Sequence, residues 1–248
     1  MARDYWMFER LHHRRVAQVL LALDGGRLDA MQCRFGGGTA IALRWGEFRE
    51  SVDMDFLVSD AEAYRELRQC LAGADDLAPL LQAGVAPIRL LRPWRIDQCG
   101  ILTVLQVESS EIKFEIVHEA RIVLDPPGRN DRLCGIGTLT DIDAAASKLL
   151  ANADRWRDDS VFSRDAIDLA MMNQPPRRLR PALEKARCAY GDVVRIDLDK
   201  ALKRLRGDPV HLQHCLGALS MTLPPAALQQ RLRALQRRLD VVAADGCA

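Results

Sequence analysis

The stretch of sequence that most constrains the fold runs from Arg34 to Val58 and reads RFGGGTAIALRWGEFRESVDMDFLV. Three consecutive glycines lead directly into AIALRW, whose residues have good helical propensity, so the first half predicts a tight turn that opens a helix. The second half, from Val52 to Val58, is a short apolar run that predicts a buried strand. We expect the chemistry of the protein to lie in this stretch.

The glycine turn is a candidate anion site. Glycines let the backbone approach a ligand closely, and the unpaired N–H groups and positive dipole end of the following helix favour a phosphate. Gly37, Gly38 and Thr39 are therefore candidate phosphate-binding residues, with the Thr39 hydroxyl as a further donor. The alternative is that the glycines only form a turn before a helix, which is the commoner use of such a pattern.

The predicted strand carries two carboxylates, Asp53 and Asp55. Alternate side chains of a strand share a face, so these two point the same way, about 6.6 Å apart along the strand, while Met54 and Phe56 point into the core. Mg²⁺ is typically bound by one or two carboxylates together with substrate phosphates. The alternative is that Asp53 begins the strand and Asp55 pairs with a surface arginine; the preceding glycine turn favours the metal site.

The composition is that of a globular protein. The chain has 248 residues, of which 48% are hydrophobic and 28% charged, enough for one domain or two small ones with a sizeable core. No apolar run approaches the roughly 20 residues that span a bilayer, and the first residues lack a signal-peptide pattern, so we expect a cytoplasmic protein without membrane contact. The seven cysteines are odd in number and form no Cys-x-x-Cys pair, which indicates reduced thiols.

The charge is distributed unevenly. From Pro175 onward there are 14 Lys and Arg residues against 7 Asp and Glu, whereas the residues before it carry an excess of acid. This asymmetry indicates an acidic, metal-binding front part and a basic surface that could meet a polyanion. The alternative is that the arginine-rich helices are only solvated faces.

Periodicity predicts further elements on both sides of the central stretch. The front part is predicted to contain helices at Leu11–Leu23 and Ala61–Leu71 and strands at Val85–Leu91, Ile101–Glu108 and Glu111–Val117. In the last strand Ile112, Phe114 and Ile116 share one face and Glu111, Lys113 and Glu115 share the other. If this strand pairs beside Asp55, Glu115 is a candidate third metal ligand; the alternative is an amphipathic edge strand.

The second part of the sequence reads as helical. Asp125 begins a Pro- and Gly-rich loop, and Thr140 to Asp143 has the spacing of a capping box that opens a helix carrying Lys148, Asn152 and Arg155 in a polar line. Ser163 is predicted to cap the next helix, which carries Asp165 and Asp168. Asn173–Pro181 reads as a linker. Helices are then expected at Pro181–Tyr190, Leu198–Leu205, His211–Leu219 and Ala226–Val242. His211, His214 and Cys215 are interpreted as ordinary helix surface and core.

Four separated pieces together match a known pattern: Gly37-Gly38-Thr39, Asp53-x-Asp55, Lys113-x-Glu115, and Lys148 with the later Arg164-Asp165-x-x-Asp168-Leu169. Over roughly Leu11 to Met172 the sequence resembles the nucleotidyltransferase family of the abortive-infection toxins AbiEii and AbiGii, with their mycobacterial MenT relatives. The Gly-Gly-Thr and Asp-x-Asp signature is shared by the wider polymerase-β-like superfamily.

The resemblance implies an α+β fold, in which a short mixed sheet flanked by helices forms a minimal nucleotidyltransferase fold and a helical C-terminal domain follows. The expected divisions are a catalytic core at 1–125, a helical part that completes the active site at 126–174, and a basic helical region at 175–248. It also implies that Gly38 and Thr39 hold NTP phosphates, that Asp53 and Asp55 carry Mg²⁺ or Mn²⁺, that Lys148 neutralises phosphate charge, and that Asp165 supports the site as a polar or acid/base residue. Glu115 stands where the superfamily often has a third Asp.

The function that the resemblance implies is transfer of a nucleotide from an NTP to RNA, with the 3′ end of tRNA as the target in the MenT branch, by a toxin that a cognate antitoxin restrains. The basic C-terminal region agrees with an RNA acceptor. Two alternatives remain open at this point: modification of a protein hydroxyl by the same chemistry, and a non-catalytic module that binds a nucleotide or an antitoxin.

Overall fold

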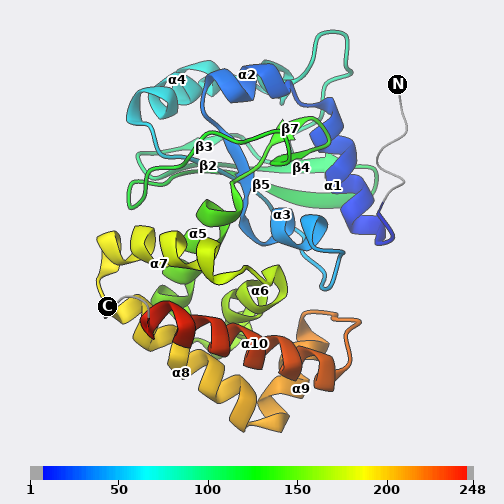
Figure 1. Cartoon of the computed structure of the whole chain (residues 1–248). Coiled ribbons are helices and arrows are strands. Elements are labelled where there is room, and N and C mark those ends of the chain that lie inside the picture. The colour runs from blue at the N-terminus through cyan, green and yellow to red at the C-terminus, as the bar shows by residue number, and fades with distance from the viewer. Residues whose placement is uncertain (1–7, 245–248) are drawn as a thin grey trace. The chain divides into compact units, whose positions relative to one another are not determined.

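The computed structural model describes residues 8–244 and divides into two compact units (Figure 1). Of the described residues, 8–47 and 51–140 form the sheet unit, and 48–50 and 141–244 form the helical unit. The three residues Phe48–Glu50 lie in sequence between the glycine turn and the Asp53 segment. The chain therefore leaves the sheet unit after Glu47, contributes three residues to the helical unit, and returns to the sheet unit at Ser51. We call this segment the connection.

The sheet unit is built on a mixed five-stranded sheet with the strand order β1-β2-β5-β4-β3. The strands are β1 (Arg34–Gly36), β2 (Met54–Val58), β3 (Arg95–Ile96), β4 (Gly100–Val107) and β5 (Ser110–His118). The pair β2 and β5 is parallel, and the other neighbours are antiparallel. A separate two-stranded ladder joins β6 (Arg132–Leu133) and β7 (Ile136–Gly137). These pairings confirm the predicted mixed sheet.

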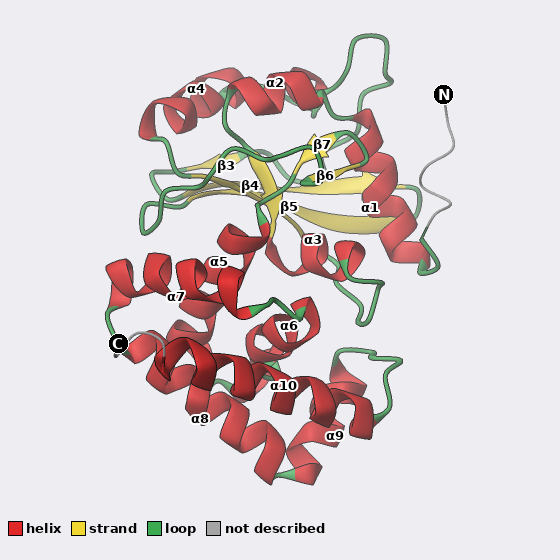
Figure 2. Ribbon diagram, in the orientation of Figure 1, coloured by secondary structure: helices red, strands yellow, loops and turns green. Residues whose placement is uncertain are grey.

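The helices of the sheet unit are α1 (Leu11–Ala22), α2 (Gly25–Ala30), α3 (Gly37–Arg44) and α4 (Ala61–Leu71), with a short 3-10 turn at Ala78–Leu80. Figure 2 shows α2 and α4 over one face of the sheet and α3 on the opposite side. Asp60 caps α4 by accepting from the backbone N–H of Ala63, as expected of this residue type. Asp24 caps α2 in the same way, by accepting from the backbone N–H of Arg27.

The core of the sheet unit follows the alternation of the strands. Phe35, Phe56 and Phe114 lie on three adjacent strands, all fully buried, with ring centroids 5.3 Å and 5.1 Å apart. Because side chains alternate along a strand, Asp55, which precedes Phe56, and Glu115, which follows Phe114, belong to the other face of the sheet. The core pattern read from the sequence is thereby confirmed, and β5 is an inner strand rather than an edge.

Up to residue 244, where the description ends, the helical unit consists of six α-helices and a short 3-10 turn at Asp159–Val161. The helices are α5 (Asp141–Arg155), α6 (Arg164–Met172), α7 (Pro176–Tyr190), α8 (Val193–Gly207), α9 (Pro209–Ala218) and α10 (Pro225–Ala244). In α10 a buried apolar stripe is formed by Leu228, Leu232, Leu235 and Leu239, whereas α6 is buried on all sides from Asp165 to Met172. The helical C-terminal domain expected from the sequence is confirmed.

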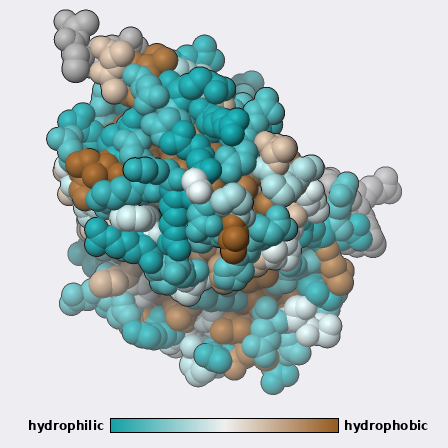
Figure 3. Space-filling view, turned by 90° about the horizontal axis from the view of Figure 1, so that it is seen from below, coloured by the Kyte–Doolittle hydropathy of each residue, from teal (hydrophilic) through white to brown (hydrophobic). Residues whose placement is uncertain are grey.

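Helices long and apolar enough to cross a bilayer are not found within residues 8–244. Figure 3 shows a largely hydrophilic face on which the apolar patches are small and separate.

Two sequence-based predictions of elements were wrong. Val85–Leu91 is not a strand: the segment makes only isolated bridges, such as Leu90 to Leu105, and Pro87 removes a donor from its middle. Asn173–Pro181 is not a linker, because α7 begins at Pro176. Proline is favoured at the first helical position, where its missing N–H has no partner to lose.

The boundary between the units also differs from the expected divisions. The structure divides after Thr140 rather than at 125, and residues 141–174 and 175–244 belong to one helical unit. The segment after 125 stays with the sheet unit because Leu139 donates its N–H to Phe35 and Arg44 bonds Asp131. Ser163 occupies the N-cap position of α6, but its hydroxyl bonds His211 Nε2 at 3.0 Å instead of capping the helix.

Candidate active site

The glycine turn and the Asp55 carboxylate are directly adjacent. In the β1–β2 ladder Gly36 is the register partner of Asp55, and Gly37 follows with a φ of +65°. A Cβ atom on Gly37 would lie only 2.2 Å from Asp55 Oδ2. Only glycine fits here, both because of the left-handed backbone and because the carboxylate occupies the space of a side chain.

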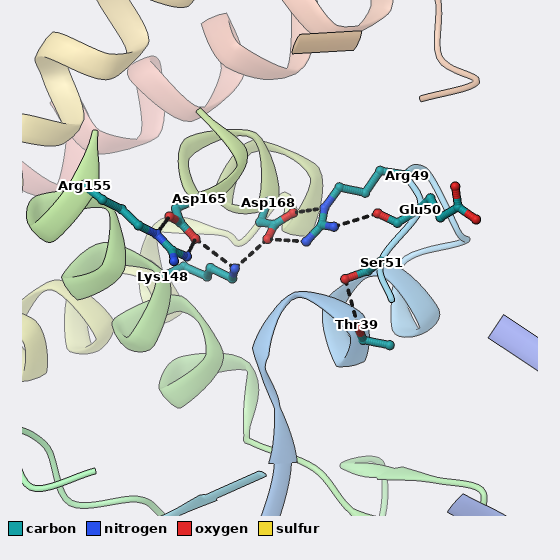
Figure 4. Close-up of polar contacts among 8 residues, drawn as sticks. All are labelled: Thr39, Arg49, Glu50, Ser51, Lys148, Arg155, Asp165 and Asp168. Atoms are coloured by element: carbon teal, nitrogen blue, oxygen red, sulfur yellow. Dashed lines mark hydrogen bonds and ion pairs between the residues drawn. The ribbon is translucent and has the colours of Figure 1, made fainter. Parts of the chain in front are cut away.

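The Thr39 hydroxyl ties the turn to the segment that carries Asp53. Thr39 is fully buried, donates its hydroxyl to the backbone carbonyl of Asp53 at 2.5 Å and lies 2.8 Å from Ser51 Oγ (Figure 4). This differs from the expectation that the hydroxyl is a phosphate donor. The backbone N–H groups of Gly37, Gly38 and Thr39, in the first turn of α3, are the donors suited to an anion at this helix end.

Asp53 and Asp55 are held in different ways. Asp55 lies inside β2, where it pairs in register with Gly36 on one side and Glu115 on the other. Asp53 lies one residue before β2, since the first register pair of the parallel ladder is Met54 with Phe114. Sheet hydrogen bonding therefore sets the position of Asp55, whereas contacts from other elements set the position of Asp53.

Glu115 lies beside Asp55 on the neighbouring strand, as the sequence predicted for a paired strand. Its carboxylate is engaged by Lys113, with Nζ 2.5 Å from Oε2. Burial by itself would lower the pKa of Lys113, but the hydrogen bond to Glu115 and the charges of Glu115, Asp55 and Asp53 raise it. The raised pKa of Lys113 therefore reports the negative potential of these three carboxylates, which a bound cation would neutralise.

The donor set of this face fits a hard divalent cation. Asp53 and Asp55 offer carboxylate oxygens, the ligands that Mg²⁺ and Mn²⁺ prefer. A cluster of three or more His, Cys, Asp or Glu side chains suited to a metal does not occur within residues 8–244. The two aspartates are therefore the candidate ligands, and the role of Glu115 as a third ligand stays a prediction.

In the helical unit, Lys148 and Asp165 lie in a buried network of charges. Lys148 Nζ is 2.9 Å from Asp165 Oδ1 and 2.7 Å from Asp168 Oδ2 (Figure 4). Arg155 makes two hydrogen bonds to the Asp165 carboxylate, at 2.8 Å and 3.0 Å. Two members of the polar line predicted on α5, Lys148 and Arg155, thus bond the aspartates of α6. Asn152, which is also buried, has a side-chain Nδ2 without a hydrogen-bond partner among the described residues.

Arg49 completes this network and was missed by the sequence analysis. It forms a bidentate ion pair with Asp168, Nε to Oδ1 at 2.7 Å and Nη2 to Oδ2 at 2.9 Å, and both side chains are almost fully buried. The two residues are 119 positions apart, and no periodicity marks an arginine in the loop after α3. Its place between the glycine turn and Asp53 is the only signal that the sequence carries.

The charges around Asp165 hold it in the ionised form. Burial alone would raise the pKa of this carboxyl, but the Lys148 ammonium and the Arg155 guanidinium hold it well below its usual range. A carboxylate with so low a pKa is a poor proton acceptor near neutral pH, where an effective general base has a pKa close to the pH of the reaction. The electrostatics favour the supporting role of Asp165 over the acid/base role.

The predicted site residues are thus distributed over both units. The sheet unit brings together Gly37, Gly38, Thr39, Asp53 and Asp55, with Glu115 beside Asp55. The helical unit brings together Lys148 and Asp165, and adds Arg49 and Asp168.

Comparisons with known proteins identify the family. The model of the nucleotidyl transferase AbiEii toxin family, type IV toxin–antitoxin system, matches residues 26–240. Curated proteins give no match to the sequence. Among solved structures, a candidate nucleotidyltransferase from H. pylori is similar with a TM-score of 0.54 and 14% identity, covering 96% of this chain and 98% of its own. JHP933 from Helicobacter pylori has a TM-score of 0.50 and 15% identity, covering 93% and 92%. Because the family model spans most of the chain, this protein belongs to the AbiEii toxin family and is a nucleotidyltransferase.

Proposed function

We propose that the protein transfers a nucleoside monophosphate from an NTP to an RNA acceptor, with the 3′ end of tRNA as the target, and that it does so with Mg²⁺ or Mn²⁺. The observation that carries the proposal is the contact between the glycine turn and Asp55, where Gly37 leaves no space for a side chain. A helix end that can bind phosphate would then lie beside a carboxylate that can bind a cation, which is the pairing that a metal–nucleotide complex requires.

The sheet unit would bind the nucleotide through its triphosphate. The N–H groups of Gly37, Gly38 and Thr39 would hold the phosphate oxygens, because they belong to the first turn of α3 and carry the positive end of its dipole. Asp53 and Asp55 would hold the cation. The bound metal would supply Lewis-acid polarisation of the phosphoryl group and activation of the acceptor hydroxyl.

The helical unit would supply a fixed positive charge. Lys148 would neutralise charge on the phosphates, as the family resemblance implies, and Asp165 and Asp168 would hold its ammonium group in place. Preorganised charges of this kind cost little reorganisation during the reaction. Arg49 and Arg155 would hold the two carboxylates that orient Lys148, through their ion pairs with Asp168 and Asp165.

The acceptor is proposed to be RNA because the chain from Pro175 onward carries 14 Lys and Arg residues against 7 Asp and Glu. Contacts from such residues to phosphates give affinity that is largely independent of sequence. Tyr190 is the only Phe, Tyr or Trp after Pro175, so base stacking is not the expected binding mode. The toxin family implies in addition a cognate antitoxin that restrains the activity.

Incubation with each α-³²P-labelled NTP, Mg²⁺ and total tRNA, followed by a denaturing gel, tests the proposal. We expect a labelled RNA band from wild-type protein and none from Asp55→Asn. Asp75→Asn, which makes the same change at an exposed loop position, is the matched control and should label like wild type. Label on a protein band instead of RNA would move the proposal to protein nucleotidylation. Wild-type labelling by Asp55→Asn would remove Asp55 from the mechanism.

A further inference from the structure

The segment Ser51–Asp53 leads into β2 and is held from outside the sheet. Asp53 precedes the first register pair of β2, so the ladder does not fix its position. Three hydrogen bonds hold the backbone of the segment instead. The N–H of Ser51 donates to His13 Nε2 at 3.2 Å, the carbonyl of Val52 is bonded by His12 Nε2 at 2.8 Å, and the carbonyl of Asp53 accepts from the Thr39 hydroxyl.

Two of these bonds come from consecutive histidines in the first turn of α1, and their partners determine the tautomers. A carbonyl oxygen only accepts, so Nε2 of His12 carries a proton. A backbone N–H only donates, so Nε2 of His13 carries none, and His13 holds its proton on Nδ1. That nitrogen lies 2.7 Å from Glu47 Oε1, which accepts it.

Glu47 is a fixed anchor for His13. Its carboxylate accepts the N–H groups of Glu9 at 2.7 Å and Arg10 at 3.1 Å, and its own carbonyl accepts from Arg10 Nε. Glu47 is a non-glycine residue with a φ of +50°, a conformation that persists where surrounding contacts determine it. The Glu47 carboxylate therefore sets the tautomer and the orientation of His13.

His13 bonds Glu47 and Ser51, and these two residues flank Phe48–Glu50, the connection that belongs to the helical unit. Within that unit Arg49 is paired with Asp168 and the N–H of Glu50 donates to the carbonyl of Leu219. The chain leaves the sheet unit after Glu47 and returns to it at Ser51. His13 binds both of these points, and His12 binds the next residue, so the histidines define where the chain re-enters the sheet unit two residues before Asp53.

We infer that His12 and His13 are positioning residues that set the location of Asp53 for cation binding. This inference rests on the proposed function, since it concerns the metal ligand Asp53. Packing alone would explain why His13 is fully buried. It would not explain why both of its ring nitrogens are hydrogen-bonded, or why His12 bonds the same backbone segment.

The test uses the full chain and Mn²⁺ alone, with binding followed by electron paramagnetic resonance. His13→Phe keeps a ring of similar size and removes both bonds, and His13→Gln places an oxygen where it can accept from Ser51. Tyr64→Phe is the matched control, because it removes one partly buried hydrogen bond to a backbone carbonyl, that of Asp97, elsewhere in the sheet unit. Loss of one such bond corresponds to about a three- to tenfold change in affinity.

We expect His13→Phe to weaken Mn²⁺ binding by that factor, His13→Gln to restore most of it, and Tyr64→Phe to bind like wild type. Hydrogen exchange is the second measurement: the amides of Ser51–Asp53 should exchange faster in His13→Phe than in Tyr64→Phe. Equal Mn²⁺ affinity and equal exchange in folded His13→Phe would overturn the inference. Failure of the proposed function looks different, because wild-type protein would then bind no Mn²⁺, or Asp55→Asn would bind it equally well.

Discussion

Replacement of Gly37 by alanine tests the contact on which the nucleotide site depends. The new methyl group would lie 2.2 Å from Asp55 Oδ2, whereas ordinary van der Waals contact begins at 3.4 Å, so the carboxylate or the turn must move by about 1.2 Å. A misplacement of about 1 Å costs on the order of 100-fold in rate. The φ of +65° adds about 1–2 kcal/mol of strain for a residue with a side chain.

Gly191→Ala separates the two effects. Gly191 has almost the same φ, +67°, but a Cβ there would meet no described atom within 4 Å. Both variants should therefore lose stability through the positive φ, roughly 2–4 °C in Tm per kcal/mol for a chain of this size, and Gly37→Ala should lose more because of the clash. Only Gly37→Ala should lose transfer of label from NTP, by about 100-fold. Wild-type transfer by Gly37→Ala, or an equal loss in both variants, would refute the reasoning that the turn must touch Asp55.

Two further predictions concern buried charge. Arg49→Met leaves Asp168 with one of its two counter-charges, and breaking a buried pair costs about 3–5 kcal/mol, so urea unfolding should show a loss near the lower end of this range; a loss below about 1 kcal/mol would contradict the assigned pairing. His13 has a pKa lowered from 6.5, chiefly by burial, against the opposing effect of Glu47 and with the help of Arg10 and His12. The unfolded chain then takes up the proton first, so the free energy of unfolding should fall as the pH drops below 6.5. His13→Gln should flatten this part of the pH profile, and an unchanged slope would count against a neutral His13.

Local sequence patterns were sufficient for most of the fold. The alternation in β5 placed Ile112, Phe114 and Ile116 in the core, and all three are fully buried. Patterns of this kind are reliable because the periods of strands and helices are set by backbone geometry and do not depend on the partner. They were insufficient at Val85–Leu91 and Asn173–Pro181. In the first segment β-branched content predicted a strand, but the chain forms only isolated bridges there. In the second segment proline predicted a linker, but Pro176 is the first residue of a helix.

The sequence by itself determined the chemical type of the site. The glycine turn and Asp55 are close in the chain, and their residue types predicted a phosphate site near a cation site, whereas the pairing of β1 with β2 that puts them in contact was not predicted. It also determined that Lys148 lies on one helix and that Asp165 and Asp168 lie together on another.

Only the tertiary structure decided what holds these groups in place. The ion pair of Arg49 with Asp168 spans 119 residues, and the bond of Ser51 to His13 spans 38. Contacts of this length arise from the packing of whole elements, which leaves no periodic trace in the residues that meet. The same holds for the Thr39 hydroxyl, whose residue type is equally suited to a phosphate or a carbonyl, and which only the fold directs to Asp53.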